Sequence, residues 1–204
     1  MAEWMQAIKN GDLEAVRSIY PHFSLFQSEK AEVNTYPKCA LETASKYGHA
    51  HIVQFLLQKN IKPTRRTFMV AAERGHLRVI EALWEKSREF GMSNVVSGKD
   101  AARSAAQFGK LDIIQFLFEQ DASTCEDAMG YAAEYGHLDI IKYLYEHGVP
   151  ITEQVQRDAV YEGDLEMFIW LYTQKRFQVN ARDVKNSEIL DWIHEHSLAD
   201  ENLI

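Results

Sequence analysis

The stretch GYAAEYGHLDIIKYLYEHG, residues 130–148, decides the fold that we expect for this chain. It opens with a small-residue segment around Ala132-Ala133, and alanine both favours helix and lets neighbouring helices approach closely. Gly136 then ends that helix, because only a residue without a Cβ adopts the closing left-handed conformation without strain. From Leu138 to Leu144 apolar residues recur at helical spacing, as on the buried stripe of an amphipathic helix. The stretch therefore predicts two helices joined at a glycine.

The same pattern occurs five more times along the chain. The other segments are MQAIKNGDLEAVRSIY (5–20), ETASKYGHAHIVQFLLQKN (42–60), MVAAERGHLRVIEALWEKS (69–87), RSAAQFGKLDIIQFLFEQD (103–121) and RDAVYEGDLEMFIWLYTQK (157–175). We call the central glycines the pivot glycines; they are Gly11, Gly48, Gly75, Gly109, Gly136 and Gly163, separated by 37, 27, 34, 27 and 27 residues. Spaced copies of one pattern indicate an internal repeat far more strongly than any single motif.

One such helix pair cannot bury its own apolar stripe, so the repeats must stack to form a core. The sequence therefore predicts an all-α fold, a solenoid of stacked helix-turn-helix repeats. We expect residues 1–204 to form a single domain of about six helix pairs. The segment NSEILDWIHEHS (186–197) matches a second helix, but Lys185 stands where a pivot glycine is expected. We interpret residues 180–197 as a truncated C-terminal cap, which closes the open apolar end of a solenoid.

The alanine pairs, the Gly-His pairs such as Gly48-His49, and the Leu- and Ile-rich second helices resemble the ankyrin-repeat family. The resemblance covers nearly the whole chain. The family's usual Thr-Pro-Leu-His opening is replaced, for example by Cys39-Ala40-Leu41-Glu42, and three spacings are shorter than the usual repeat of about 33 residues. Because the helices are intact, the shortening falls on the inter-repeat connections, where the family carries projecting hairpins. Only residues 21–38 and 87–99 leave room for such hairpins. The alternative, a tetratricopeptide array, has a period of about 34 throughout, and the spacings of 27 disfavour it.

Charge is distributed unevenly along the chain. Residues 1–100 contain 14 Lys and Arg against 11 Asp and Glu, which gives +3, whereas residues 101–204 contain 8 against 19, which gives −11. A nucleic-acid-binding protein needs a basic surface, so we expect no nucleic-acid partner. A large partner of the second half is expected to be basic. The alternative explanation of the acidic surface is simple solubility.

Two further features concern the cellular setting. The N-terminal residues contain no apolar signal core, and no stretch approaches the roughly 18 consecutive apolar residues of a membrane helix. Cys39 and Cys125 lie 86 positions apart without the pattern of a disulfide framework, so we expect reduced thiols. We expect a monomer, not attached to a membrane, in the cytoplasm or in a host cytoplasm if the protein is a secreted effector.

The resemblance also implies where a partner binds. In ankyrin repeats the first helices line a concave surface, and the two residues before each pivot glycine face it. The partner-binding candidates are Tyr47, Arg74, Phe108, Tyr131, Tyr135 and Tyr161. Aromatic side chains dominate binding hot spots because they combine a large apolar area with a polar tip. The alternative is that each ring packs on the neighbouring repeat and serves stacking alone.

Three other groups are predicted to be mainly structural. Residues at the same position of successive second helices are expected to lie in the core; they are Leu57, Trp84, Phe118, Tyr145 and Tyr172. A basic cluster is expected to be a solvated face, with an acidic or phosphate ligand as the alternative; it comprises Lys62, Arg65, Arg66, Arg74 and Arg78. The closest histidine pairs, His49 with His51 and His194 with His196, are two residues apart and point to different sides of a helix, so we expect no metal site.

The sequence contains no phosphate-binding loop and no nucleophile elbow, so we expect no catalytic residues, no cofactor and no enzyme activity. The leading hypothesis is a protein–protein interaction module, an adaptor or scaffold, that binds a protein partner through the concave face of the array. The alternative is an inhibitor that blocks a single target, such as a pathogen-encoded protein acting on a host protein.

Overall fold

The computed structural model describes residues 2–24, 35–91, 94–161, 165–174, 179 and 184–196. In these ranges the chain forms α-helices and one 3₁₀ helix, without strands. The first helices of the repeats are α1 (Ala2–Asn10), α3 (Thr35–Lys46), α5 (Arg65–Glu73), α7 (Asn94–Gln107), α9 (Ala128–Glu134) and α11 (Glu153–Tyr161). The second helices are α2 (Leu13–Ser24), α4 (Ala50–Gln58), α6 (Leu77–Glu89), α8 (Leu111–Gln120), α10 (Leu138–Glu146) and α12 (Leu165–Gln174). The other two elements are η3 (Ala122–Cys125) and α13 (Ser187–His196).

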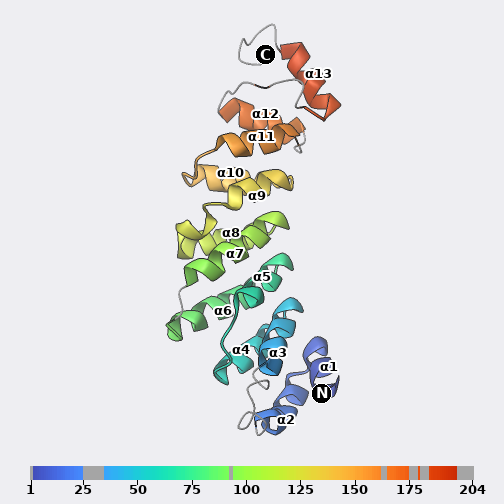
Figure 1. Cartoon of the computed structure of the whole chain (residues 1–204), viewed down its shortest axis with the longest axis vertical. Helices are drawn as coiled ribbons and strands as arrows, with labels where there is room; N and C mark the ends of the chain where they lie inside the picture. The colour runs from blue at the N-terminus through green and yellow to red at the C-terminus, as the bar shows by residue number, and fades with distance from the viewer. Residues whose placement is uncertain are drawn as a thin grey trace.

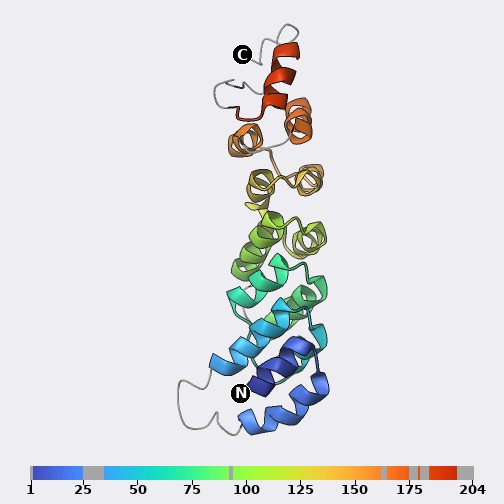
Figure 2. The same cartoon turned by 90° about the vertical axis from the view of Figure 1, so that its right-hand side faces the viewer.

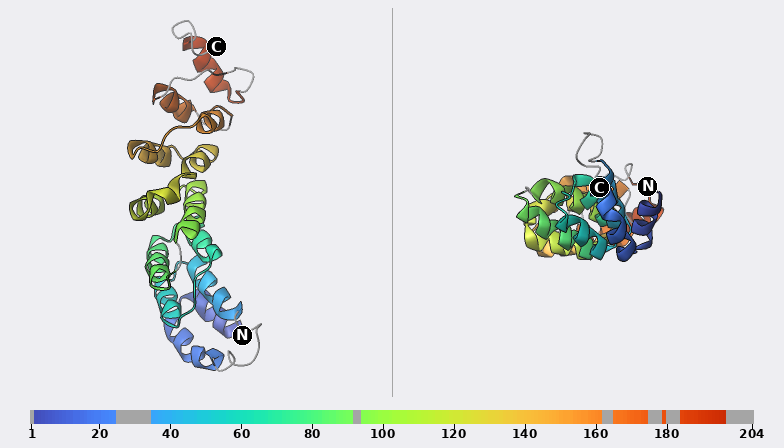
Figure 3. Two further views of the ribbon diagram at one scale, coloured as in Figure 1. Left: turned by 60° about the vertical axis from the view of Figure 1, so that its left-hand side comes forward. Right: turned by 90° about the horizontal axis from the view of Figure 1, so that it is seen from below.

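The helix pairs are stacked in chain order into an elongated array (Figure 1). The first helices form one layer and the second helices form the other (Figure 2). Neighbouring repeats touch within each layer, as α3 and α5 do in the first layer and α4 and α6 in the second. The array is gently bowed, and its first helices lie on the inner side of the curve (Figure 3). The predicted all-α solenoid is therefore confirmed.

Small side chains on the first helices and apolar stripes on the second helices build the core. The repeated alanines are all fully buried, namely Ala44, Ala71, Ala72, Ala105, Ala106, Ala132, Ala133 and Ala159. In α10 the side chains of Ile140, Ile141 and Leu144 are buried, while Asp139 and Glu146 are exposed. Burying each large apolar side chain stabilises the fold by about 1.5–3 kcal/mol. Because these residues join one continuous cluster from Trp4 to Leu171, each repeat depends on its neighbours.

The turn inside each repeat has the same backbone conformation. The five pivot glycines that the structure describes have φ between 65° and 78°, and Gly163 lies outside the described residues. At Gly48, the glycine N–H donates to the Ser45 carbonyl (3.3 Å), and the N–H of His49 donates to the Ala44 carbonyl (3.0 Å). These two bonds are the Schellman closure of a helix, which requires the left-handed residue that glycine supplies.

At three of the pivot turns, the histidine after the glycine packs against the preceding repeat. The ring of His76 lies against Gly48, where an added Cβ would come within 2.6 Å of Nδ1. Its Nε2 donates to the backbone carbonyl of Lys46 in the preceding first helix (3.1 Å). We call this contact the glycine–imidazole lock. The equivalent pairs are His49 on Gly11 and His137 on Gly109.

Two repeat boundaries lack this lock. The side chain of Lys110 replaces the imidazole beside Gly75, where its Cδ lies 3.1 Å from the position of an added Cβ. At Gly136, no atom of the described residues lies within 4 Å of that position. The lock therefore joins only some of the repeats.

The sequence leaves open whether residues 87–99 form a hairpin, and the structure shows mostly helix in the described part of this range. Helix α6 continues to Glu89 and α7 already begins at Asn94, with residues 92–93 outside the described part. The longer spacing is taken up by helix, because α7 has 14 residues whereas α9 has 7. Of the other predicted hairpin region, residues 25–34 lie outside the described residues, and its described ends belong to α2 and α3.

Helix α13 lies at the C-terminal end of the array and packs on α12 (Figure 1). Its residues Ile189 and Ile193 join Phe168 and Tyr172 in a second, smaller apolar cluster. This is the place predicted for the cap, although residues 180–183 and 197 lie outside the described part. The single domain over residues 1–204 stays a prediction. None of the described helices has the combination of length and apolar character needed to cross a membrane.

We expect Gly48→Ala to destabilise the protein more than Gly136→Ala. The two glycines have φ of 76° and 78°, so either alanine is forced into the left-handed region at about 1–2 kcal/mol. Only at Gly48 does the new methyl group also meet a histidine ring. Urea denaturation should show a loss of about 2–4 kcal/mol for Gly48→Ala and about 1–2 kcal/mol for Gly136→Ala. Equal losses would show that the lock does not stabilise the stack.

The two cysteines should react very differently, because Cys39 is exposed on α3 and Cys125 is buried, and both are free thiols. Burial disfavours the thiolate and raises the pKa of Cys125 to about 11. Since the thiolate is the reactive form, iodoacetamide at about pH 8 should alkylate Cys39 alone in the folded protein and both thiols in urea. Intact-mass measurement counts the adducts. Rapid double alkylation of the folded protein would contradict this burial.

Candidate partner-binding surface

Four exposed rings lie at the C-terminal ends of first helices. They are Tyr47, Phe108, Tyr135 and Tyr161, and between 44% and 48% of each residue's surface is exposed. The first three directly precede a pivot glycine, and the backbone N–H of each donates to the carbonyl four residues earlier at 3.1 Å. This shared backbone geometry holds the three side chains at equivalent positions of their repeats. We call the four residues the aromatic row.

The structure separates the two other predicted binding residues from this row. Tyr131 is half-buried and packs against the main core, so it presents less surface than the four rings. Arg74 holds the place of a ring in its own repeat and is exposed, with its Nε 3.5 Å from a carboxylate oxygen of Glu73. The row is therefore interrupted by a cation between Tyr47 and Phe108.

The residues predicted in the core at one position of successive second helices are buried or half-buried, except for one. Leu57, Trp84 and Tyr172 are buried, and Phe118 is half-buried against the core. The prediction is wrong for Tyr145, which is 36% exposed. Its ring meets Trp170 of the next repeat edge-on, with the centroids 5.5 Å apart. One edge contact leaves the rest of the Tyr145 ring uncovered.

Two arginines of the predicted basic cluster form ion pairs with carboxylates of neighbouring repeats. The guanidinium of Arg65 binds both carboxylate oxygens of Asp100, with Nη2 2.9 Å from Oδ1. Arg66 pairs with Glu42 of the preceding repeat. These two arginines therefore connect α3, α5 and α7.

The same kind of pairing continues toward α9. Arg103 on α7 pairs with Asp127 (2.6 Å), and Lys99 pairs with Glu126 (2.8 Å). Lys62 belongs to the predicted basic cluster as well, and its ammonium lies 5.8 Å from the centroid of Phe90. Arg65 and Arg66 thus link repeats while 63% and 75% of their side-chain surfaces stay exposed to solvent. Arg78 is exposed and takes part in none of the ion pairs found among the described residues.

The histidines at the start of the second helices bind backbone. His49 precedes α4, so it does not follow the helical geometry that we expected for a pair two residues apart. As a result, the rings of His49 and His51 lie only 5.9 Å apart. Each Nε2 donates to a carbonyl of the preceding repeat at 3.0 Å, at Lys9 and Gly11 respectively. Both rings therefore serve stacking. Within the described ranges, no three potential metal ligands gather in one place.

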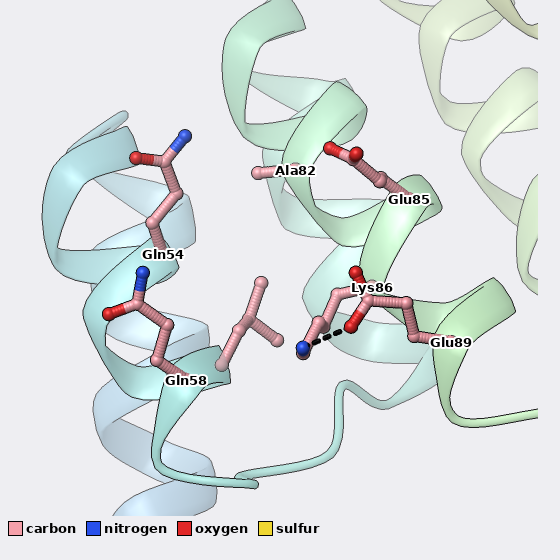
Figure 4. A pocket seen from close by; sticks show the side chains of 7 residues that line it. Gln54, Gln58, Ala82, Glu85, Lys86 and Glu89 are labelled. Carbon is pink, nitrogen blue, oxygen red and sulfur yellow. Dashed lines mark hydrogen bonds and ion pairs between the residues drawn. The ribbon is translucent and has the colours of Figure 1, made fainter.

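A groove of about 340 Å³ lies between α4 and α6 in the layer of second helices (Figure 4). Its lining residues are Gln54, Leu57, Gln58, Ala82, Glu85, Lys86 and Glu89. Lys86 is paired with Glu89, one turn further along α6 on the same side of the groove. The lining contains no serine, cysteine or histidine, and most of its side chains end in solvated amide or carboxylate groups.

Comparisons with known proteins agree with this architecture. A family model described as ankyrin repeats (3 copies) matches residues 68–155 and 103–183, which together span more than half of the chain. No curated protein matches the chain significantly in sequence. Among solved structures, the ankyrin repeat domain of human ASB11 is similar, with a TM-score of 0.64 and 17% identity. That alignment covers 87% of this chain and 84% of the other, and at this identity it concerns the fold alone.

The family match, the repeated Gly-His turns and the two layers of stacked helices lead to one assignment. The chain belongs to the ankyrin-repeat family.

Proposed function

We propose that this protein is an adaptor or scaffold that captures a protein partner along the inner side of its array. The observation that carries the proposal is the aromatic row, four exposed rings at the C-terminal ends of first helices. A soluble protein gains nothing in stability from leaving such rings uncovered, and exposed rings of this kind mark interaction surfaces. Ankyrin repeats generally mediate protein–protein interactions and are typically non-catalytic.

The shape of the array supports the same proposal. The first helices lie on the inner side of the curve (Figure 3), so their ends face a common concave surface. The backbone of this surface is held by the Schellman turns and the core beneath it. A rigid surface loses little conformational entropy on binding, which favours affinity. We also propose that this binding takes place in the cytoplasm, where both free thiols remain reduced.

The test is partner capture by ring variants. We expect Phe108→Ala combined with Tyr135→Ala to reduce recovery of the main partner at least about tenfold, because truncating a hot-spot ring costs about 1–2 kcal/mol. Quantitative mass spectrometry of proteins retained by the immobilised chain measures the recovery. Several proteins lost together would indicate an adaptor, and one protein lost alone would indicate a single-target inhibitor.

Tyr145→Ala provides the matched control, because Tyr145 is an exposed tyrosine of the second-helix layer. It should leave the recovery unchanged. Circular dichroism and urea denaturation must show that all variants remain folded. Recovery of the same proteins in the same amounts by the double variant would overturn the proposed function.

A further inference from the structure

The residues around the pivot turns differ in charge between the two halves of the array. We call this side of the molecule the turn edge, meaning the side on which the first helices end and the second helices begin. In the N-terminal half its exposed residues include the cations Lys9, Lys46 and Arg74 and one carboxylate, Asp12. In the C-terminal half, three exposed carboxylates, Asp112, Glu134 and Asp139, outnumber the cation Lys110, whose side chain lies against Gly75. The turn edge therefore changes from basic to acidic along the array.

Three carboxylates flank two rings of the aromatic row in the acidic half. Asp112 is the second residue of α8, and it follows Phe108 around the pivot turn. Glu134 ends α9, and Asp139 is the second residue of α10, so these two border the turn that contains Tyr135. None of the three carboxylates takes part in the ion pairs found among the described residues. They differ in this respect from Asp100 and Asp127, which bind arginines of the array.

One ring of the aromatic row has a cation over its face within this chain. The ammonium nitrogen of Lys185 lies 3.5 Å from the centroid of the Tyr161 ring, the last member of the aromatic row. A cation over an aromatic face is attracted by the negative potential of the ring. Phe108 and Tyr135 are exposed to the same extent as Tyr161, and no cation lies over their rings in the described structure.

From this juxtaposition we infer that the acidic half of the turn edge binds an extended, lysine- or arginine-rich segment of a protein partner. Its cations lie over Phe108 and Tyr135 and next to Asp112, Glu134 and Asp139. The inference rests on the proposed function and adds the chemistry of the partner. Carboxylates supply long-range attraction for cations, and the rings supply contact area and cation–π attraction.

The repeat geometry also implies a spacing for those cations. Helices packed side by side lie about 8–10 Å apart, so Phe108 and Tyr135 are separated by about one such step. An extended chain advances about 3.3 Å per residue. A segment running along the array therefore reaches successive rings with every third residue. Since two rings of the row are open, the expected binding segment has basic residues at positions i and i+3.

The test measures binding of a fluorescent peptide with lysine at every third position, separated by Gly and Ser, using fluorescence anisotropy at about 50 mM NaCl. One control peptide has the same composition with its lysines adjacent, and another has glutamate in place of lysine. We expect the spaced lysine peptide to bind most tightly and the glutamate peptide not to bind. Binding should weaken steeply with added salt.

Two variants identify the site. Asp112→Asn with Glu134→Gln and Asp139→Asn should weaken binding about tenfold, since three surface charge contacts are lost. Phe108→Leu with Tyr135→Leu keeps apolar bulk but removes the ring faces, and it should weaken binding about fivefold.

A matched control removes the same charge elsewhere. Glu81→Gln with Glu119→Gln and Glu146→Gln changes exposed positions of α6, α8 and α10, and it should alter binding less than about twofold. Equal binding by the carboxylate variant and the parent, or equal binding of all three peptides, overturns the inference. In that case the proposed function still stands or falls on partner capture, because capture is scored with ring variants and needs no basic partner.

Discussion

The array depends on a glycine that must satisfy two constraints at once. At the end of a first helix it takes the left-handed conformation that turns the chain back, and it leaves open the space into which the next imidazole packs. At Gly48, the ring of His76 fills that space and donates to the carbonyl of Lys46. A turn within one repeat is thereby tied to the position of the next repeat. Helix pairs that cannot fold alone thus acquire a defined stacking register.

Much of this was predictable from the sequence, because repetition makes local signals add up. The pivot glycines, the buried alanines and the apolar stripes each follow from the chemistry of single residues and recur with the repeat. The extent of α7 was not predictable, since a longer spacing is equally compatible with a hairpin or with more helix. The contact of Tyr145 with Trp170 was not predictable either. It depends on which face of one ring the neighbouring repeat covers.

The candidate surface shows the same division. Exposure of Tyr47, Phe108, Tyr135 and Tyr161 followed from their position before the turn, but the partial burial of Tyr131 did not. Pairing between charges was also hidden, because Arg65 and Asp100 are 35 positions apart and lie in different repeats. Charges in such pairs hold the array together, whereas charges outside these pairs remain available for binding a partner. A charge count along the sequence treats both kinds alike.

The missing lock at Gly136 has a consequence for the dynamics of the array. In a solenoid each boundary contributes its own coupling energy, and a boundary with weaker coupling is where segments open independently. The residue that follows Gly163 is Asp164, so the sequence supplies no imidazole for this boundary, and the last repeat lacks this type of contact with the others. Tyr161 belongs to that repeat. If that repeat detached, the aromatic row would lose Tyr161 and keep its other three rings in place. The same chain would then present either three or four rings to a partner.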